Sequence, residues 1–366
     1  MSERINVTRS SMPDFDEYIT ELQDVWNSRW LSNRGEASKK FEEDLKNKLE
    51  VSNLYLFANG HLALEVTIEA LGLKEGSEVI TTPYTHVSTT HSITRNGLVP
   101  VFVDVNESDY TINSELIESA ITERTVAIVA THVYGFICDV EKIETIAKKH
   151  NLLVVYDAAH AFGVKYKGIG VGNFGDAAMF STHATKVFHT IEGGIVAYKD
   201  IPQFEKLRNL VNFGYVNEDE IDYIGTNARM NEFEAVMGIC NLRHFDDEVA
   251  KRENAAKRYY ERLDGIKGIV IPKPNSDTQW NYSYFPVLFD GYNKDRNQIK
   301  TELMRHNIYA RKYFYPIVNR AKCYCDKYGE ISLPVSEYAS EHVLTLPMYA
   351  DLTIEDVDRI CDVILA

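Results

Sequence analysis

Between residues 52 and 200 the chain alternates short apolar runs with stretches whose apolar residues follow helical spacing. The run Leu152-Leu153-Val154-Val155-Tyr156 is continuously apolar, which is typical of a parallel strand covered on both faces. The pattern predicts strands at 52–58, 78–82, 99–103, 126–131, 152–156 and 177–181, and helices at 60–73, 89–96, 114–122 and 140–150. Strands and helices in this alternation indicate an α/β fold with a mostly parallel sheet.

The pattern changes after Arg229, where a long helical stretch continues to about Leu263. Separate strands and helices follow at 282–289, 295–306 and 353–365, and the last helix starts with a capping box of Thr353 and Asp356. We therefore expect two domains: an N-terminal arm with a large domain at 1–245, and a small C-terminal α+β domain at 246–366.

Composition places the chain among ordinary globular proteins, with 366 residues of which 45% are hydrophobic and 25% charged. The 39 basic and 54 acidic residues give a net charge of -15. Phosphate backbones and anionic membrane surfaces need basic patches, so neither nucleic acid nor a membrane is an expected partner. A local basic pocket is compatible with this balance.

Cysteine content and the N-terminal segment bear on the compartment. The five cysteines are scattered and odd in number, which argues against a disulfide framework and for a reducing environment. Cys323 and Cys325 lack a second pair, so no metal site is expected. The N-terminus has no apolar signal region, and the apolar stretches are too short to span a membrane. We expect a cytoplasmic protein.

Candidate chemistry is sought after the strands, because ligands of open α/β sheets bind beyond the carboxyl ends of the strands. Asp157 follows one predicted strand, and by itself it could equally cap the next turn. His160, taken alone, would more often be a buried core histidine. Lys186 follows another strand among small, hydroxyl and aromatic residues, and partial removal from water favours a neutral, nucleophilic amine. In isolation it would more often be a surface lysine.

Two further segments complete the set. Asn59-Gly60-His61 lies at a strand-to-helix junction, where free N–H groups and the helix dipole can bind phosphate, although a plain turn is the alternative. The segment 83–89 offers the flat ring of His86 at another strand end. A phosphate cradle, a flat ring, a carboxylate and a lysine on one sheet edge match the needs of pyridoxal 5'-phosphate (PLP), whose aldehyde a lysine binds and whose ring nitrogen an acid keeps protonated.

A dinucleotide-like segment, Gly170-Val171-Gly172-Asn173-Phe174-Gly175, competes with this interpretation. That fingerprint works only where a strand turns into a helix whose N-terminus faces pyrophosphate. Here the glycines precede residues 176–181, which are predicted to form a strand. A nicotinamide oxidoreductase is therefore disfavoured.

The same residues resemble a known family. Phe180-Ser181-Thr182-His183-Ala184-Thr185-Lys186 with Glu192-Gly193-Gly194, preceded by Asp157-Ala158-Ala159-His160-Ala161, is similar to the DegT/DnrJ/EryC1/StrS aminotransferases. The resemblance extends to 30–35, 225–232, 310–316 and 346–349, which is nearly the whole chain. It implies the PLP-dependent aspartate-aminotransferase fold (fold type I) and amination of keto groups on nucleotide-linked sugars.

The resemblance also implies roles for individual residues. Lys186 corresponds to the lysine that forms a Schiff base with PLP, and Asp157 to the partner of the pyridine nitrogen. His160 corresponds to the residue that contacts the cofactor's phenolic oxygen. Ser181 and the turn Gly60-His61 correspond to the phosphate site. In these enzymes L-glutamate is the amino donor, and the cofactor alternates with pyridoxamine 5'-phosphate.

Asn227 matches an asparagine that, in the family, reaches the phosphate site of the neighbouring subunit. A homodimer with active sites at the subunit interface is therefore implied. Arg229 and Arg311 are candidates for binding the carboxylates of the donor, although either could be an ordinary interface or surface arginine.

Two positions depart from the family pattern. Where relatives often have Gly-Thr at the phosphate turn, this chain has Gly60-His61, which leaves only the backbone N–H groups as secure donors. Where relatives often stack Trp, Phe or Tyr on the pyridine ring, this chain has His86, a smaller ring.

The reaction is narrowed by two comparisons within the family. Lys186 excludes the branch that replaces the lysine with histidine and performs dehydration. The segment His183 to Lys186 resembles that of enzymes acting on 4-keto sugars, and the overall pattern is most similar to members that form dTDP-4-amino-4,6-dideoxyglucose for O-antigen synthesis. The alternatives are a 3-keto sugar aminotransferase and a non-catalytic, PLP-binding regulatory protein of the same fold.

Overall fold

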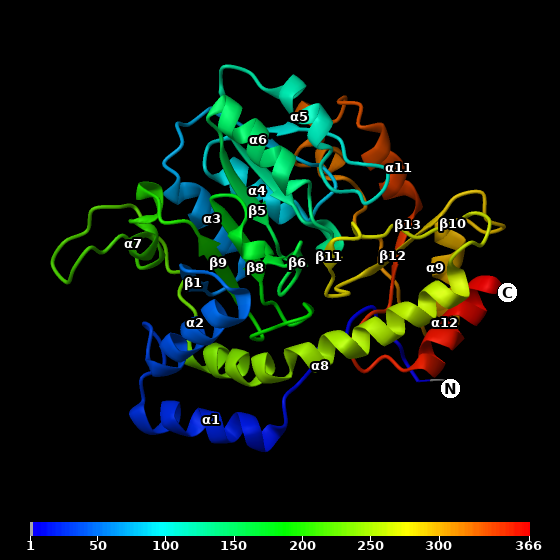
Figure 1. Cartoon of the computed structure of the whole chain (residues 1–366), viewed down its shortest axis with the longest axis horizontal. Helices are drawn as coiled ribbons and strands as arrows, with labels where there is room; N and C mark the ends of the chain where they lie inside the picture. The colour runs from blue at the N-terminus through cyan, green and yellow to red at the C-terminus, as the bar shows by residue number, and fades with distance from the viewer. Residues whose placement is uncertain (1–2) are drawn as a thin grey trace.

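Helices cover both faces of a central sheet in the computed structural model, which describes residues 3–366 (Figure 1). Within these residues the sheet has seven strands in the order β1-β9-β8-β5-β4-β2-β3. Their bounds are β1 Leu54–Phe57, β2 Glu78–Thr81, β3 Val99–Phe102, β4 Thr125–Thr131, β5 Leu153–Asp157, β8 Ala177–Ser181 and β9 Gly194–Tyr198.

Strand direction brings the predicted site segments to one edge. β2 runs parallel to β3 and β4, β4 to β5, and β5 to β8. β9 is antiparallel to both β8 and β1, so it alone among these strands is reversed. The strands β8, β5, β4 and β2 are consecutive in the sheet and share one direction. Their carboxyl ends therefore lie next to one another at one edge of the sheet.

Two apolar layers hold helices against the sheet. On one face, α3 Gly60–Ala70, α4 Val87–Arg95 and α7 Leu207–Val211 share a buried cluster with Phe57 and Val79. On the other face, α2 Glu36–Leu49, α5 Ser114–Ala120 and α6 Val140–His150 pack against Ile80 and Ile128. Because side chains alternate along a strand, Val79 and Ile80 serve opposite layers.

The C-terminal part forms a separate apolar cluster around a small antiparallel sheet. This sheet consists of β10 Ile269–Val270, β12 Phe285–Phe289 and β13 Val343–Leu346, flanked by α9 Arg296–Arg305, α11 Pro334–His342 and α12 Ile354–Leu365. A third sheet joins β6 Lys165–Tyr166, β7 Ile169–Gly170 and β11 Thr278–Gln279. The shorter or peripheral elements are α1 Phe15–Ser28, α10 Cys325–Tyr328, η1 Val133–Gly135, η2 Val171–Asn173, η3 Pro202–Phe204 and η4 Val318–Arg320.

One long helix, α8 Glu232–Leu263, runs beneath the molecule from α1 and α2 at one end to α12 at the other (Figure 1). Its first turn has a reciprocal capping box of Asn231 and Glu234. The predicted domain boundary between residues 245 and 246 falls inside this helix, and the boundary stays a prediction. The N-terminal arm pairs with the C-terminal part, since Ile5 forms a parallel bridge with Ile308.

The predicted α/β fold, with a mostly parallel sheet and a smaller C-terminal part, is confirmed. Most predicted strands and helices occur within a few residues of their expected bounds. The reversed strand β9 and the helices α1 and α2 were not among the predicted elements. Within residues 3–366, no helix combines the length and apolar character that crossing a membrane requires.

The dinucleotide-like segment has the predicted strand context. Gly170 ends β7, the short η2 turn follows, and the chain then enters β8. No α-helix begins at these glycines in the described chain, so they do not present a helix N-terminus to a pyrophosphate.

Candidate active site

The predicted site residues gather where β5 and β8 end. Asp157 is the last residue of β5 and Ser181 the last of β8, and these two strands are adjacent and parallel. Lys186 lies on the loop that connects β8 with β9. The fold thus brings a carboxylate, a hydroxyl and an amine to one sheet edge, as the sequence predicts.

Asp157 is buried, and its carboxylate has two hydrogen-bond donors. Oδ2 accepts a bond of 2.6 Å from the Thr89 hydroxyl, and Oδ1 accepts one of 3.1 Å from the Ala159 N–H. A carboxylate offers about four acceptor positions, so part of this capacity is open for a ligand. The alternative of a simple turn cap accounts only for the Ala159 contact.

The loop that carries Lys186 is held in shape by its own hydrogen bonds. The Lys186 N–H donates to the His183 carbonyl at 2.9 Å, and the hydroxyls of Thr182 and Thr190 lie 2.7 Å apart. Gly193 closes the loop where a Cβ would come within 2.3 Å of the Thr182 hydroxyl. The Gly193-Gly194 pair therefore serves close packing where the loop returns to β9.

The Lys186 side chain is half-buried and faces an aromatic ring. Its Nζ lies 3.5 Å from the Tyr284 hydroxyl and 5.8 Å from the centre of the Tyr284 ring. A narrow crevice adjoins the lysine and is lined in part by His160, Ser181 and Tyr284. The structure therefore places Lys186 within the site rather than among the solvated surface lysines.

His160 is buried beside this lysine, with a defined orientation. Its Nδ1 accepts a 3.1 Å hydrogen bond from the Tyr134 N–H, so in the neutral ring the proton is on Nε2. Burial lowers the pKa of His160 well below the usual value, and the positive charges of Lys186 and His86 lower it further. His160 is thus a neutral Nε2–H donor at physiological pH.

His86 is the N-cap residue of α4, where its Nδ1 accepts from the Ser88 N–H at 3.2 Å. Partial removal from water lowers the pKa of His86, Lys186 lowers it further, and Asp157 opposes the shift. His86 is exposed.

The turn before α3 forms a cradle against the end of β8. Asn59 caps the helix by accepting from the Leu62 N–H at 2.9 Å, which leaves the N–H groups of Gly60 and His61 without partners inside the helix. A Cβ on Gly60 would lie 2.9 Å from the Ser181 Cβ and 3.1 Å from its Oγ. Glycine is thus required for the close approach of a helix N-terminus to a hydroxyl.

The His61 side chain takes no part in this cradle. Its Nδ1 lies 2.8 Å from the Ser88 hydroxyl, and its Nε2 lies 3.2 Å from a Glu65 carboxylate oxygen. These contacts direct the imidazole toward α4 and along α3. Only the backbone of His61 is available to an anion in the cradle.

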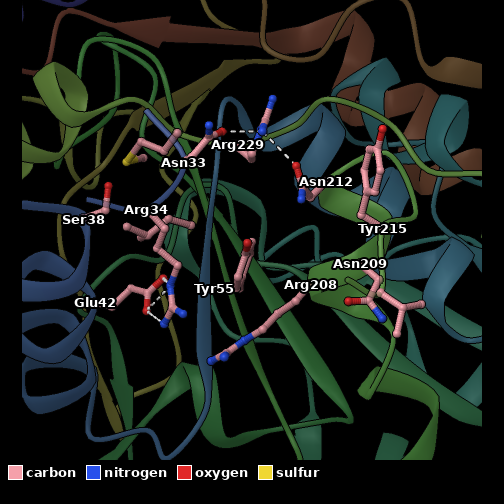
Figure 2. Close-up of a pocket in the computed structure, with 13 residues that line it drawn as sticks. Asn33, Arg34, Ser38, Glu42, Tyr55, Arg208, Asn209, Asn212, Tyr215 and Arg229 are labelled. Carbon is pink, nitrogen blue, oxygen red and sulfur yellow. Dashed lines mark hydrogen bonds and ion pairs between the residues drawn. The ribbon is translucent and has the colours of Figure 1, made fainter. Parts of the chain in front are cut away.

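Asn227 contacts Arg229, which lines a pocket that Lys186 does not line (Figure 2). The Arg229 guanidinium donates to Asn227 Oδ1 at 3.1 Å, to Asn212 Oδ1 at 2.8 Å, and to Asn33. These acceptors are neutral amides, and no ion pair of Arg229 occurs among the described residues. The pocket therefore carries an unneutralised positive charge.

Arg311, the other candidate for carboxylate binding, has a structural role through its backbone. It forms a bridge with Thr345, with hydrogen bonds of 3.1 and 2.7 Å in the two directions, and its side chain is exposed.

Several site residues were missed by the sequence analysis. Thr89 follows the singled-out His86 by three positions, and Thr85 and Thr131 extend its contacts. The spacing of Thr85 and Thr89, four residues apart across a helix start, is a signal that could have indicated a shared face. Tyr284 comes from the C-terminal part and has no local signal.

Comparison with a family model gives a match over residues 14–365, to the DegT/DnrJ/EryC1/StrS aminotransferase family. A dTDP-4-amino-4,6-dideoxy-D-glucose transaminase of Shigella dysenteriae is 40% identical over 365 residues, which cover 100% of this chain and 99% of the relative.

Solved structures agree with this match. The structure of DesI in the presence of its TDP-sugar product superimposes with a TM-score of 0.94 at 29% identity, covering 100% of this chain and 93% of that one. The PLP form of Spr1654 from Streptococcus pneumoniae gives a TM-score of 0.89 at 25% identity, covering 98% and 97%.

Proposed function

The chain belongs to the DegT/DnrJ/EryC1/StrS aminotransferase family and is a nucleotide-sugar aminotransferase; on that premise we propose that it converts dTDP-4-keto-6-deoxyglucose to the 4-amino sugar. PLP is the proposed cofactor and L-glutamate the proposed amino donor. The observation that carries the proposal is the 40% identity, over the full length of both chains, to a transaminase named for this amino sugar.

The residues of the site fit PLP. The Gly60 turn and the Ser181 hydroxyl form an anion cradle that any Cβ at position 60 would fill, and the helix N-terminus adds a favourable dipole. Asp157 has open acceptor capacity for a ring N–H. Lys186 would hold the aldehyde and His86 would stack on the ring. When bound, PLP supplies an electrophilic aldehyde and a ring that accepts electrons.

Lys186 is the group that moves protons in this proposal. Its Nζ, when unprotonated and free, would act as the base that removes a proton from the α-carbon of the amino donor and then as the acid that returns the proton. The Tyr284 hydroxyl, 3.5 Å from Nζ, limits where the amine can swing. In the amination of the sugar ketone, the same Lys186 amine would transfer the proton in the opposite direction.

Two neighbours set the electrostatics around this lysine. The Asp157 carboxylate keeps a bound ring nitrogen protonated, because an adjacent negative charge favours the cationic form. His160 donates from Nε2, since Tyr134 occupies Nδ1. Because His160 is neutral, it would donate a hydrogen bond to the cofactor's phenolic oxygen without adding a second positive charge beside the protonated ring nitrogen.

We further propose that the functional unit is a homodimer. Arg229 lines a pocket with unneutralised positive charge that Lys186 does not line, and it donates a hydrogen bond to Asn227 (Figure 2). In a dimer these side chains would complete the anion sites of the partner. Mixing an inactive Lys186→Ala subunit with an inactive Asn227→Ala subunit would then restore part of the activity.

The decisive experiment offers the purified protein, loaded with PLP, matched pairs of keto sugars with L-glutamate. We expect an amino-sugar product, identified by mass spectrometry and NMR, from the dTDP-linked 4-keto-6-deoxy sugar. UDP- and GDP-linked 4-keto sugars and the dTDP-linked 3-keto isomer serve as comparisons, and Lys186→Ala as the inactive control. Preferential amination of the 3-keto isomer would contradict the regiochemistry. Absence of any reaction with glutamate, in a protein that binds PLP, would indicate a non-catalytic regulatory protein.

A further inference from the structure

We propose that three buried threonine hydroxyls form a directional hydrogen-bond chain that ends on Asp157, in which Thr89 positions the carboxylate for the cofactor's ring nitrogen. The proposal rests on the role proposed above for Asp157. Thr89 is a positioning residue, since it acts through the carboxylate, and Thr85 and Thr131 act through Thr89.

The hydrogen-bond chain of the three threonines and Asp157 is continuous in the structure. The Thr131 and Thr85 hydroxyls are 3.0 Å apart, those of Thr85 and Thr89 are 2.9 Å apart, and the Thr89 hydroxyl lies 2.6 Å from Asp157 Oδ2. Each threonine comes from a different element: the end of β4, the segment after β2, and α4. The chain therefore connects the carboxyl ends of three strands at the site edge.

The direction of the hydrogen bonds follows from the carboxylate. A carboxylate oxygen accepts and does not donate, so the Thr89 hydroxyl must donate to Asp157. Its one proton is then used, and Thr89 can only accept from Thr85. Thr85 in turn accepts from Thr131. The O–H dipoles all point toward Asp157, and hydrogen bonds in such a row polarise one another.

Burial makes the chain hard to replace. All three threonines and Asp157 are at most 3% exposed, so water cannot supply a lost donor. A carboxylate oxygen that loses its donor in such a place is left poorly solvated. The Thr89 contact occupies one acceptor position of Oδ2 and the Ala159 N–H one of Oδ1, which fixes the carboxylate plane.

Thr90, the residue after Thr89, offers a matched control. Thr90 lies on the same helix and is equally buried, but its hydroxyl has no hydrogen-bond partner among the described residues. Thr89→Val and Thr90→Val therefore remove the same group from neighbouring positions, and only the first removes a donor to Asp157. Thr89→Ser keeps the hydroxyl and removes only the methyl group.

The test measures the affinity of the apoprotein for PLP, the transamination rate, and the unfolding midpoint of each variant. For Thr89→Val we expect PLP binding about 10-fold weaker and a rate about 10- to 100-fold lower, as for loss of a hydrogen bond to a charged group. Thr89→Ser should restore both values, and Thr90→Val should change neither. Thr85→Val and Thr131→Val should show successively smaller losses.

A double-mutant cycle separates positioning from packing. In the background of Asp157→Asn, replacement of Thr89 by Val should cause no further loss of PLP affinity, because its target is already changed. The proposal is overturned if Thr89→Val behaves like Thr90→Val, if Thr89→Ser is as impaired as Thr89→Val, or if the two replacements add in full. If Thr89→Val does not fold, Thr85→Val serves as the test in its place. Unchanged PLP affinity in Thr85→Val would then overturn the proposed hydrogen-bond chain.

Failure of the chain and failure of the proposed function give different results. If the wild type aminates no sugar yet binds PLP with the expected dependence on Asp157 and Thr89, the proposed hydrogen-bond chain is supported and the proposed substrate is wrong. If Asp157→Asn binds PLP and turns over as the wild type does, the role of Asp157 is wrong and the chain fails with it.

Discussion

Two helix N-termini in this molecule have a glycine in the first turn or at the cap, Gly35 as the N-cap of α2 and Gly60 as the first residue of α3, but they differ in whether a protein carboxylate occupies them. At α2, the carboxylate of Glu232 accepts from the N–H groups of Gly35 and Ala37, both at 2.9 Å, and from Ser38. At α3, Gly60 packs against Ser181, and the first N–H groups of the helix have no protein carboxylate as a partner among the described residues. The first N-terminus is closed by the protein itself, and the second is left for a ligand.

The difference shows how to separate structural from functional anion sites. Both termini have the dipole and the orphan donors that attract negative charge. At each one a glycine permits close approach: a Cβ on Gly35 would lie 2.7 Å from a Glu232 oxygen, and one on Gly60 2.9 Å from the Ser181 Cβ. What distinguishes them is whether the donors are already satisfied from within the fold.

The largest effect is expected from opening the closed terminus with Glu232→Gln. The amide retains one acceptor and turns an NH2 toward backbone donors, so several buried groups lose their partners. We expect a loss of about 2–4 kcal/mol in the free energy of unfolding, measured by urea denaturation of the apoprotein.

PLP affinity of the folded fraction should be unchanged in Glu232→Gln. Glu36→Gln, an exposed residue of the same first turn, is the matched control and should change stability by about 0.5 kcal/mol or less. Equal stability of Glu232→Gln and Glu36→Gln would mean that α2 does not depend on the carboxylate.

The next largest effect is expected from blocking the open terminus with Gly60→Ala. Its methyl group would press on Ser181 at the point where the phosphate cradle forms. We expect the apoprotein to bind PLP about 10- to 100-fold more weakly, as measured by absorbance titration. Gly35→Ala, the equivalent change at α2, should reduce stability and leave PLP affinity intact. A fall in affinity in both variants would erase the distinction between the two termini.

A smaller effect is expected from Ser181→Ala, which leaves the open terminus in shape and removes one hydroxyl. If Ser181 donates to the phosphate, PLP affinity should fall about 10-fold, as for a hydrogen bond to a charged group. Thr185→Ala removes an exposed hydroxyl of the neighbouring loop and should bind PLP normally. Full affinity in Ser181→Ala would assign the cradle to backbone N–H groups alone.

The smallest effect is expected at a third helix N-terminus, that of α8, where the Glu234 carboxylate accepts a hydrogen bond from the Asn231 N–H. Burial raises the pKa of Glu234 from 4.5 to about 7, and the nearby Glu192 adds to the shift. The folded protein holds this proton more tightly than the unfolded chain, so stability falls as pH rises from about 4.5 to about 7.

Glu234→Gln keeps the capping acceptor and removes the titration. Relative to the wild type it should gain about 1–2 °C in melting temperature between pH 5 and pH 8, a small amount because the group is only partly removed from water. A constant difference between the two proteins across this range would refute the shift.

Much of the large-domain fold could be predicted from the sequence, because strands such as β5 are buried on both faces and appear as continuous apolar runs. The position of β1 could not. It reaches the sheet edge only through the reversed strand β9, and the pairing of Leu54 with Ala197 leaves no local mark on either segment. The arm residue Ile5 likewise gains its place from a distant partner, Ile308.

The site was predictable where function sits at strand ends and less so where it depends on contacts between distant segments. Asp157 ends the apolar strand β5, and Lys186 lies on the loop after β8, the strand that pairs with β5. Thr89 was missed because a threonine in a helix start is ordinary until its hydroxyl meets a carboxylate 68 positions later in the chain. The proximity of Tyr284 to Lys186 depends on packing between the two parts of the molecule.

The uninterrupted course of α8 has a consequence for dissecting the protein. Its 32 residues correspond to about 48 Å of rigid rod, and both ends are anchored, one by Glu232 on α2 and the other against α12. A cut at residue 245 would sever that rod and leave each fragment with a bare apolar stripe. The two halves should therefore melt in a single transition, and fragments made separately should aggregate unless they are co-expressed.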